Sequence, residues 1–412
     1  MPPAQASSVP AIAASPYPLR AGNRVELLLD GVAAFRRLCQ AIEAARRSVW
    51  ATITFLWSTF EMPDGRGPPL AVLEQAARRG IDVRLIFWQP DDSTAYLREN
   101  AFWGAPDHLA LLRVQAPSLQ VRFDRARPGF CQHQKSWLID AGEDDAMAFL
   151  GGLNLNPHSL AVPGHGGDGE NHDLYIALSG PAVADVQRNF EQRWDGTRRA
   201  VRPPPPAGLS EVQIQRTMPD GERTILAQYL AALGAAREAI YLENQHVEVP
   251  EIVEALAAAL QRGVEVALVA PTTHALAPLA PLLACPRFTL AGLYGRAADG
   301  RRSPVHVHSK LMIVDDQWLT VGSANLHRFS LMGNAELNAA IWGRETAIGF
   351  RQRLLEEHLA IDTGALGSRA ALQRFRAVAH DNRRRLVGGE ADWPGLAVAL
   401  DAADSRSRGS RT

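Results

Sequence analysis

Lysine is almost absent from this 412-residue sequence: of its 43 lysine and arginine residues, only Lys135 and Lys310 are lysines. Arginine carries a planar fork, whereas lysine is a compact point charge that can lie beside a single phosphate oxygen. Each lysine follows a histidine by two positions, and these histidines are His133 and His308. We therefore take the two histidine–lysine pairs as the first candidates for a functional site.

Cysteine is also scarce, and so are long apolar runs. Cys39, Cys131 and Cys285 are odd in number and far apart, so no disulfide framework is predicted. No run approaches the roughly 18 apolar residues that a membrane span needs. The N-terminus lacks the charged and apolar regions of a secretory signal. We expect a cytoplasmic protein, with peripheral contact to a membrane as an open alternative.

Net charge of either sign is lacking as well. The formal charge is −1, and no long basic run occurs outside the C-terminal tail. A dedicated nucleic-acid-binding protein usually carries a basic footprint, so the charge argues against that class. The hydrophobic fraction of 46% and the charged fraction of 21% are typical of a globular protein with a sizeable core.

The two histidine–lysine pairs lie in two copies of a longer pattern. An aspartate, Asp140 or Asp315, follows each lysine by five positions, and a Gly-x-x-Asn segment ending at Asn154 or Asn325 comes later. The apolar runs after each lysine favour strands, in which residues two apart share a face. Each copy therefore presents one imidazole and one ammonium together, which makes half of a site for an anionic, oxygen-rich group.

Other segments repeat in the same order. Residues 235–241 resemble residues 44–50, and residues 261–268 resemble residues 78–85. With the histidine–lysine pairs, these matches indicate an internal duplication. Because helices alternate with strands, we expect an α/β fold of two pseudo-symmetric lobes, each a mixed sheet flanked by helices, with the site between them.

The composition divides the chain into five parts. We expect a disordered tail over 1–22, an N-terminal lobe over 23–199, a proline-rich linker over 200–209, a C-terminal lobe over 210–366, and a helical and disordered tail over 367–412.

The pattern His-x-Lys-x-x-x-x-Asp, six residues, then Gly-Ser/Gly-x-Asn resembles the signature of the phospholipase D superfamily. The second copy fits at every position, whereas the first has ten residues between Asp140 and Gly151, and Gly152 where the second has Ser323. We expect the extra residues to lengthen a hairpin turn. The resemblance covers about residues 25–360.

The resemblance implies a metal-independent, two-step displacement at a phosphodiester. His133 is expected to form a covalent phosphohistidine, and His308 to act as the acid and then the base. Lysine and asparagine side chains would hold the non-bridging oxygens, so neither a metal nor another cofactor is expected. These side chains are Lys135, Lys310, Asn154 and Asn325.

The resemblance also assigns supporting residues. Asp173 and Glu336 are expected to orient the two histidines. Four residues are expected to maintain the structure of the motifs: Asp140, Asp315, Gly152 and Ser323. The run Glu243-Asn244-Gln245 resembles the Glu-Asn-Gln strand of two-motif phospholipases D and is expected to bind substrate.

The remaining histidines give little sign of a metal site. His306 and His308 could share an ion, but no cysteine or acidic cluster accompanies them, so we predict none. We expect His165 and His172 to be ordinary loop or edge residues. They lie in or beside the glycine-rich segment 157–171, which is either a plain surface excursion or a mobile flap.

Three functions are compatible with these features. The leading one is a bacterial phospholipase D or phosphatidyltransferase, including cardiolipin-synthase-like transfer, that works as a monomer on phospholipids. The second is a nuclease of the same superfamily, which the neutral charge does not favour. The third is a non-catalytic relative, which would be expected to have lost a histidine or a lysine.

Overall fold

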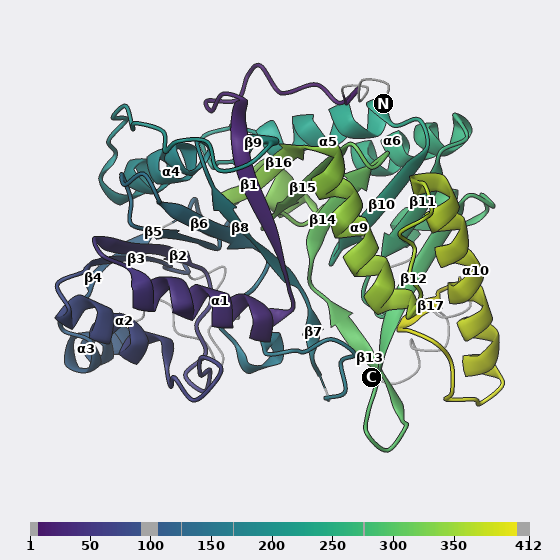
Figure 1. Cartoon of the computed structure of the whole chain (residues 1–412), viewed down its shortest axis with the longest axis horizontal. Helices are drawn as coiled ribbons and strands as arrows, with labels where there is room; N and C mark the ends of the chain where they lie inside the picture. Colours follow the sequence, from purple (N-terminus) through teal and green to yellow (C-terminus); the bar gives the residue numbers. More distant parts are fainter. Residues whose placement is uncertain (1–6, 92–105, 125, 168, 275–276, 402–412) are drawn as a thin grey trace.

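The computed structural model describes residues 7–91, 106–124, 126–167, 169–274 and 277–401. A large mixed sheet runs through two lobes that lie side by side, and helices flank it (Figure 1). The predicted α/β class is therefore confirmed.

Strand pairing gives the N-terminal lobe the order β4-β3-β2-β5-β6-β8-β1. The pairs β2–β3 and β3–β4 are parallel, and the others are antiparallel. The strands are β1 (Arg20–Leu29), β2 (Ser48–Ile53), β3 (Asp82–Trp88), β4 (Gln120–Asp124), β5 (Ser136–Ile139), β6 (Met147–Gly151) and β8 (Leu174–Ser179).

The C-terminal lobe repeats this order as β12-β11-β10-β14-β15-β16-β9, with β10–β11 and β11–β12 as its parallel pairs. Strand β1 pairs with β9, so the sheet continues from one lobe into the other. The strands are β9 (Ser210–Thr217), β10 (Ala239–Asn244), β11 (Glu265–Val269), β12 (Phe288–Arg296), β14 (Lys310–Val314), β15 (Trp318–Gly322) and β16 (Glu336–Trp342).

Helices occupy matching places in the two lobes. α1 leads into β2 as α5 leads into β10, and α2 leads into β3 as α6 leads into β11. The two repeats found in the sequence are these helix-to-strand passages. The helices are α1 (Gly31–Ala44), α2 (Pro69–Arg78), α3 (Pro106–Gln115), α4 (Val183–Asp195), α5 (Thr224–Ala235), α6 (Pro250–Gln261), α7 (Ala280–Leu283), α8 (Arg328–Met332), α9 (Arg344–Leu359) and α10 (Ser368–Val387).

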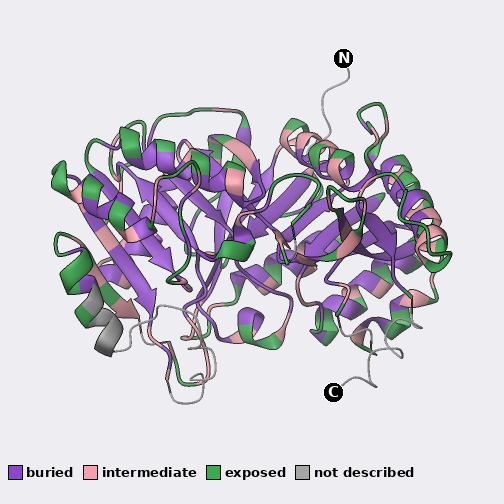
Figure 2. Cartoon of the chain, turned by 90° about the horizontal axis from the view of Figure 1, so that it is seen from below, coloured by how far each residue is buried: buried purple, intermediate pink, exposed green. Residues whose placement is uncertain are grey.

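Hydrophobic periodicity explains how the helices pack. In α1, Phe35, Leu38 and Ile42 recur at helical spacing on one face and are fully buried, whereas β2 is buried along its whole length. Figure 2 shows the same division across the molecule: the central strands are buried, and the outer faces of the helices are exposed.

The chain before β1 is ordered from residue 7 onward. Val9 and Tyr17 are buried, and the indole nitrogen of Trp342 donates a 2.7 Å hydrogen bond to the carbonyl of Val9. The side chain of Gln213 bonds both the N–H and the carbonyl of Ile12. The predicted disorder over 1–22 is therefore wrong for residues 7–22, because these apolar side chains pack on the C-terminal lobe. Residues 1–6 lie outside the described part of the chain.

The chain after residue 367 belongs to the C-terminal lobe. It forms α10, and β17 (Ala397–Ala399) then pairs with β12. The described part of the predicted tail thus adds one helix to the C-terminal lobe and one strand to its sheet. Residues 402–412 lie outside the described part of the chain. No helix or strand occurs between α4 and β9, where the linker was predicted.

Asp140 and Asp315 end the motif strands β5 and β14 in the same way. Both have a φ of 53°, in the left-handed region, which aspartate tolerates better than most residues. The Asp140 carboxylate accepts from three successive backbone N–H groups at 46–48, and Asp315 from three at 237–239. Each aspartate thus ties a motif strand to the start of the neighbouring strand. The extra residues of the first copy extend the β5–β6 turn, as expected.

We predict that Asp140→Ala lowers the free energy of unfolding by about 3 kcal/mol, because it leaves three N–H groups without an acceptor and puts alanine in a left-handed conformation. Asp140→Asn keeps one acceptor oxygen and should lose less. Denaturant unfolding measures both. The control is Asp144→Ala, in the same turn, whose exposed side chain contacts only Arg202. Equal stability of the Asp140→Ala and Asp144→Ala variants would contradict this account.

Candidate active site

The segment before each histidine–lysine pair crosses into the other lobe. The backbone N–H of His133 donates to the carbonyl of Ala335 at 2.9 Å, beside a parallel bridge between Gln132 and Ala335. In the matching place, the N–H of His308 donates to the carbonyl of His172 at 2.8 Å, where β13 (Arg302–Val307) pairs with β7 (Asn171–His172). Backbone hydrogen bonds therefore hold each motif against the opposite lobe.

This crossing decides which acid orients which histidine. His133 Nδ1 lies 2.9 Å from Glu336 Oε2, and His308 Nδ1 lies 2.6 Å from Asp173 Oδ2. Glu336 directly follows Ala335, and Asp173 directly follows His172, the two residues whose carbonyls accept the backbone N–H groups of the motif histidines. Each acid therefore contacts the histidine of the other lobe. With Nδ1 engaged, Nε2 of each imidazole is left as the reactive atom.

Both lysines are buried beside their histidines. Lys135 Nζ donates to His133 O at 2.9 Å and to Thr54 Oγ1 at 3.2 Å, and Lys310 Nζ donates to His308 O. Burial lowers the pKa of Lys135 to about 8 and that of Lys310 to about 7, although Glu336 raises the first and Asp173 the second. Both ammonium groups therefore lose their protons much more readily than an exposed lysine does.

The two imidazoles are neutral at pH 7. Burial lowers the pKa of His133 to about 4 against the opposing effect of Glu336, and it lowers the pKa of His308 well below its usual range. Charges from the opposite motif add to this, because Lys310 lowers the pKa of His133 and Lys135 that of His308. The two pairs thus act on each other electrostatically, as parts of one site would.

The two orienting acids differ in their surroundings. Glu336 accepts hydrogen bonds from His133 and three further groups, which come from Ser323, Ser330 and Asn334. Burial would raise the pKa of Glu336, but His133 and these contacts outweigh it and lower the pKa. Asp173 Oδ2 shares a hydrogen bond with His308 Nδ1, and Asp173 Oδ1 accepts from the N–H of Leu174; burial raises the pKa of Asp173 to about 7.

The two copies differ at one motif position, which is Gly152 in the first copy and Ser323 in the second. A Cβ atom on Gly152 would lie 2.3 Å from Asp173 Oδ1, so no side chain fits there without moving the acid. Ser323 takes the matching place in the second copy and instead donates to Glu336 at 2.6 Å. The sequence shows the substitution, but only the structure shows that it makes room for Asp173.

Asn154 and Asn325 follow strands β6 and β15 and are buried, with 7% and 4% of their surface exposed. Within the described chain, their Oδ1 atoms have no hydrogen-bond partner. A buried amide without a partner is costly unless a ligand or water satisfies it. This fits two amides that are kept for a bound group.

The first residue of the Glu-Asn-Gln strand is held by hydrogen bonds within the protein. Glu243 is fully buried and accepts from His172, Ser309, His358 and Tyr241 at 2.6–3.0 Å. Because its oxygens are occupied by the protein, Glu243 is positioned as a structural residue, and substrate binding by it stays a prediction.

The other two residues of this strand differ from each other. Asn244 Oδ1 accepts from the backbone N–H groups of His246 and Leu326, so this oxygen is also occupied by the protein. Gln245 lies against His306, at 3.3 Å between Nε2 atoms, and is half-buried.

Comparisons with known proteins agree with this geometry. A family model described as "Cardiolipin synthase, PLD-like domain" matches residues 38–194 and 229–357. Cardiolipin synthase A of Pseudomonas entomophila (strain L48) is 26% identical over 82% of this chain and 69% of its own length. Cardiolipin synthase B of Escherichia coli (strain K12) is 27% identical over 79% of this chain and 78% of its own length.

Among solved structures, a phosphatidylserine synthase from Haemophilus influenzae Rd KW20 superposes with a TM-score of 0.55 at 12% identity, over 90% of this chain and 96% of that one. At this identity the likeness shows the fold alone. Of the helices in the described part of the chain, none has both the length and the apolar character needed to span a bilayer.

We predict that anion binding weakens as pH rises, because the two ammonium groups lose their protons through pKa values of about 7 and about 8. Sulfate is a suitable probe, since its own charge is constant in this range. Its affinity, measured by titration calorimetry, should fall at least about tenfold between pH 6 and pH 9. Lys135→Met with Lys310→Met should remove the dependence. An affinity that stays constant to pH 9 would refute the assignment.

Proposed function

Because the chain belongs to the family of cardiolipin synthases with a phospholipase D-like domain, it is a phosphatidyltransferase of the phospholipase D type, and we propose that it works through a covalent phosphohistidine on His133. The observation that carries this mechanism is the crossed arrangement of the site. Each lobe supplies one imidazole, and the other lobe supplies the carboxylate that orients it.

In the first step, Nε2 of neutral His133 attacks phosphorus, a P–N bond forms, and the bond from phosphorus to the leaving alcohol breaks. When Asp173, whose pKa burial raises to about 7, carries a proton and donates it to Nδ1, neutral His308 holds its own proton on Nε2. That Nε2 proton passes to the leaving alcohol, and Nδ1 takes the proton of Asp173. In the second step, the acceptor alcohol or water loses its proton to His308 and attacks phosphorus, which releases His133. The two lysines and two asparagines would stabilise the non-bridging oxygens throughout.

The surroundings of the two acids support His133 as the nucleophile. Phosphorylation at Nε2 leaves the ring with cationic character, so an ionised carboxylate at Nδ1 stabilises the intermediate. Glu336 has four hydrogen-bond donors that keep it ionised, whereas Asp173 has the N–H of Leu174 and one hydrogen bond with His308 in which the proton can lie on either side. His308 is then left as the group that moves the proton.

Two ammonium groups beside the reacting phosphate supply the positive charge that a metal gives to other phosphoryl-transfer enzymes. The proposed chemistry therefore needs no metal at phosphorus. One chain also supplies both halves of the site, so a monomer would suffice.

We predict that His133→Ala and His308→Ala each lower kcat for transfer of a phosphatidyl group to a primary alcohol by more than about a thousandfold. The assay supplies mixed phospholipid vesicles and follows the new phosphatidyl alcohol. Acid-quenched wild-type enzyme should carry an acid-labile phosphoryl adduct on His133. The exposed His380→Ala is the control, because its position on α10 is remote from the motifs.

An adduct on His308 would reverse the two roles. Cleavage of DNA without any lipid turnover would favour the nuclease alternative and overturn the lipid assignment.

An apolar cavity beside the first motif fits the acyl part of a phospholipid. It has a volume of about 380 Å³ and is lined by Leu56, Trp57, Phe60, Pro69, Leu70 and neighbouring residues. Leu56 bridges to Leu155, the residue directly after Asn154, so one wall of the cavity adjoins the segment that carries Asn154. We propose that it holds part of one acyl chain. The exposed ring of Phe329, a few residues after Asn325, would add peripheral contact with the membrane.

We predict that Ala71→Trp, which fills this cavity from its exposed edge, raises KM for long-chain phospholipid about tenfold and leaves KM for a short-chain analogue unchanged. Steady-state kinetics with both substrates measures the difference. Ala257→Trp, on the partly exposed face of α6, controls for the added indole. An equal effect on both chain lengths would rule out an acyl role for the cavity.

A further inference from the structure

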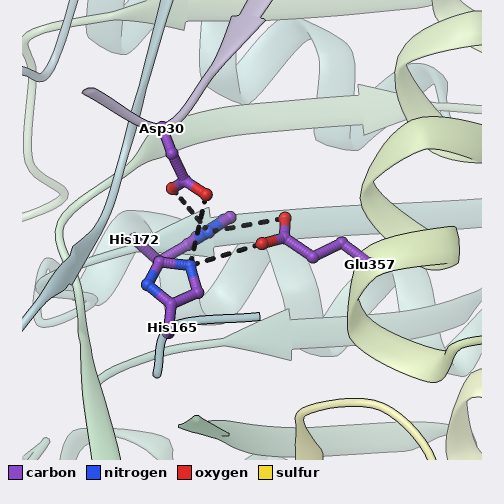
Figure 3. A group of neighbouring side chains, drawn as sticks. All are labelled: Asp30, His165, His172 and Glu357. Carbon is purple, nitrogen blue, oxygen red and sulfur yellow. Dashed lines mark ion pairs between the residues drawn. The ribbon is translucent and has the colours of Figure 1, made fainter. Parts of the chain in front are cut away.

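A buried cluster of two histidines and two carboxylates lies apart from the reacting groups. Asp30 comes from the end of β1, His165 from the glycine-rich segment, His172 from β7, and Glu357 from α9 of the other lobe. All four side chains point at one another (Figure 3), and none has more than 6% of its surface exposed. Four chain segments from both lobes therefore converge on one point.

Six polar atoms of this cluster face one another as ion pairs at 3.3–3.9 Å, but none of the six makes a hydrogen bond of ordinary geometry in the described chain. They are both oxygens of Asp30 and of Glu357, Nε2 of His165 and Nδ1 of His172. Buried groups of this kind are strongly destabilising unless something satisfies them. The observation points to a missing ligand that accepts two imidazole nitrogens and two carboxylates at once.

The two ring nitrogens lie near both carboxylates, at distances close to those between ligands of one metal ion. His165 Nε2 lies 3.3 Å from Asp30 Oδ2 and 3.3 Å from Glu357 Oε1, and His172 Nδ1 lies 3.5 Å from the other oxygen of Asp30 and 3.9 Å from the other oxygen of Glu357. One ligand atom from each of the four residues lies within 4.8 Å of the others. Zinc bonds of about 2.0–2.2 Å to nitrogen and oxygen give tetrahedral edges of roughly 3.3–3.6 Å. Direct imidazolium–carboxylate hydrogen bonds would be shorter, at about 2.7–2.9 Å.

A carboxylate lies behind one of the two imidazoles at hydrogen-bond distance. His172 Nε2, the nitrogen that faces away from the cluster, lies 3.0 Å from Glu243 Oε2, whereas His165 Nδ1 and Glu170 are 3.6 Å apart, beyond hydrogen-bond distance. Histidines that bind a metal usually donate their other N–H to a carboxylate or carbonyl, which fixes the tautomer and the ring orientation. This gives Glu243 a role that the family pattern did not suggest.

We propose that Asp30, His165, His172 and Glu357 bind one Zn²⁺ ion in a closed, four-coordinate structural site. Two carboxylates balance the charge of the ion, and two imidazoles with two carboxylates suit Zn²⁺ better than the harder Mg²⁺ or Ca²⁺. All four positions are taken by protein, so the ion would bind no substrate.

The proposed ion would connect the two lobes next to the catalytic groups. His172 immediately precedes Asp173, the residue that orients His308, and its carbonyl accepts the N–H of His308. The ion would also hold the glycine-rich segment against β12, where Gly295 allows the carbonyl of His165 to approach closely. His165 itself has a φ of 47°, a conformation that a non-glycine residue adopts only when its contacts require it.

The test uses the full chain, purified without a histidine tag and supplied with Zn²⁺. We expect one zinc per chain by elemental analysis, and X-ray absorption should show four nitrogen or oxygen ligands at about 2.0–2.2 Å with no sulfur. Replacement by Co²⁺ should give the strong visible bands of a tetrahedral site. Removal of the ion should lower Tm by roughly 10 °C.

Two variants separate this site from the catalytic one. His165→Ala should abolish stoichiometric binding, and Glu243→Gln should weaken zinc affinity about 10–100-fold. His308→Ala and the exposed His380→Ala should each keep one zinc.

Three results would overturn the proposal: less than half an equivalent of zinc after reconstitution, six-coordinate or sulfur ligation, or loss of zinc in His308→Ala. If His165→Ala or Glu243→Gln fails to fold, the spectra of the wild-type protein still decide the question. None of these measurements depends on turnover, so a negative result would leave the proposed transfer reaction untouched.

Discussion

The site depends on one constraint: the segment that leads into each motif strand hydrogen-bonds to the opposite lobe. The N–H groups of His133 and His308 donate to the carbonyls of Ala335 and His172, one residue before Glu336 and Asp173. The backbone therefore brings each acid to the histidine of the other lobe. Neither lobe alone contains a complete oriented imidazole, so the chemistry requires both lobes in register.

Duplication gives the site its symmetry, and small departures from it divide the roles. Ser323 donates to Glu336, whereas glycine at the matching position 152 leaves room for Asp173. Glu336 is surrounded by donors and has a lowered pKa, while burial raises the pKa of Asp173. The two acids at matching positions therefore differ in charge, as the proposed division into a nucleophilic and a proton-transferring histidine requires.

The buried network around Glu243 connects catalytic and structural parts of the molecule. Glu243 bonds Ser309, which lies between His308 and Lys310, and also His172 and His358. His172 in turn faces Asp30 and Glu357. These contacts connect the proposed metal cluster to Ser309, the residue directly before the motif strand β14.

The sequence by itself determined the α/β class, the duplication and the two histidine–lysine pairs, because spacing along a strand and repeated segments are local properties. It also identified Asp173 and Glu336, but through family resemblance. Only the tertiary structure decided which acid meets which histidine, that Glu243 and Asn244 are occupied by the protein, and that residues 7–22 pack on the C-terminal lobe. It alone assembled Asp30, His165, His172 and Glu357, since residues more than 300 positions apart share no local pattern and are brought together only by the packing of α9 against the N-terminal lobe.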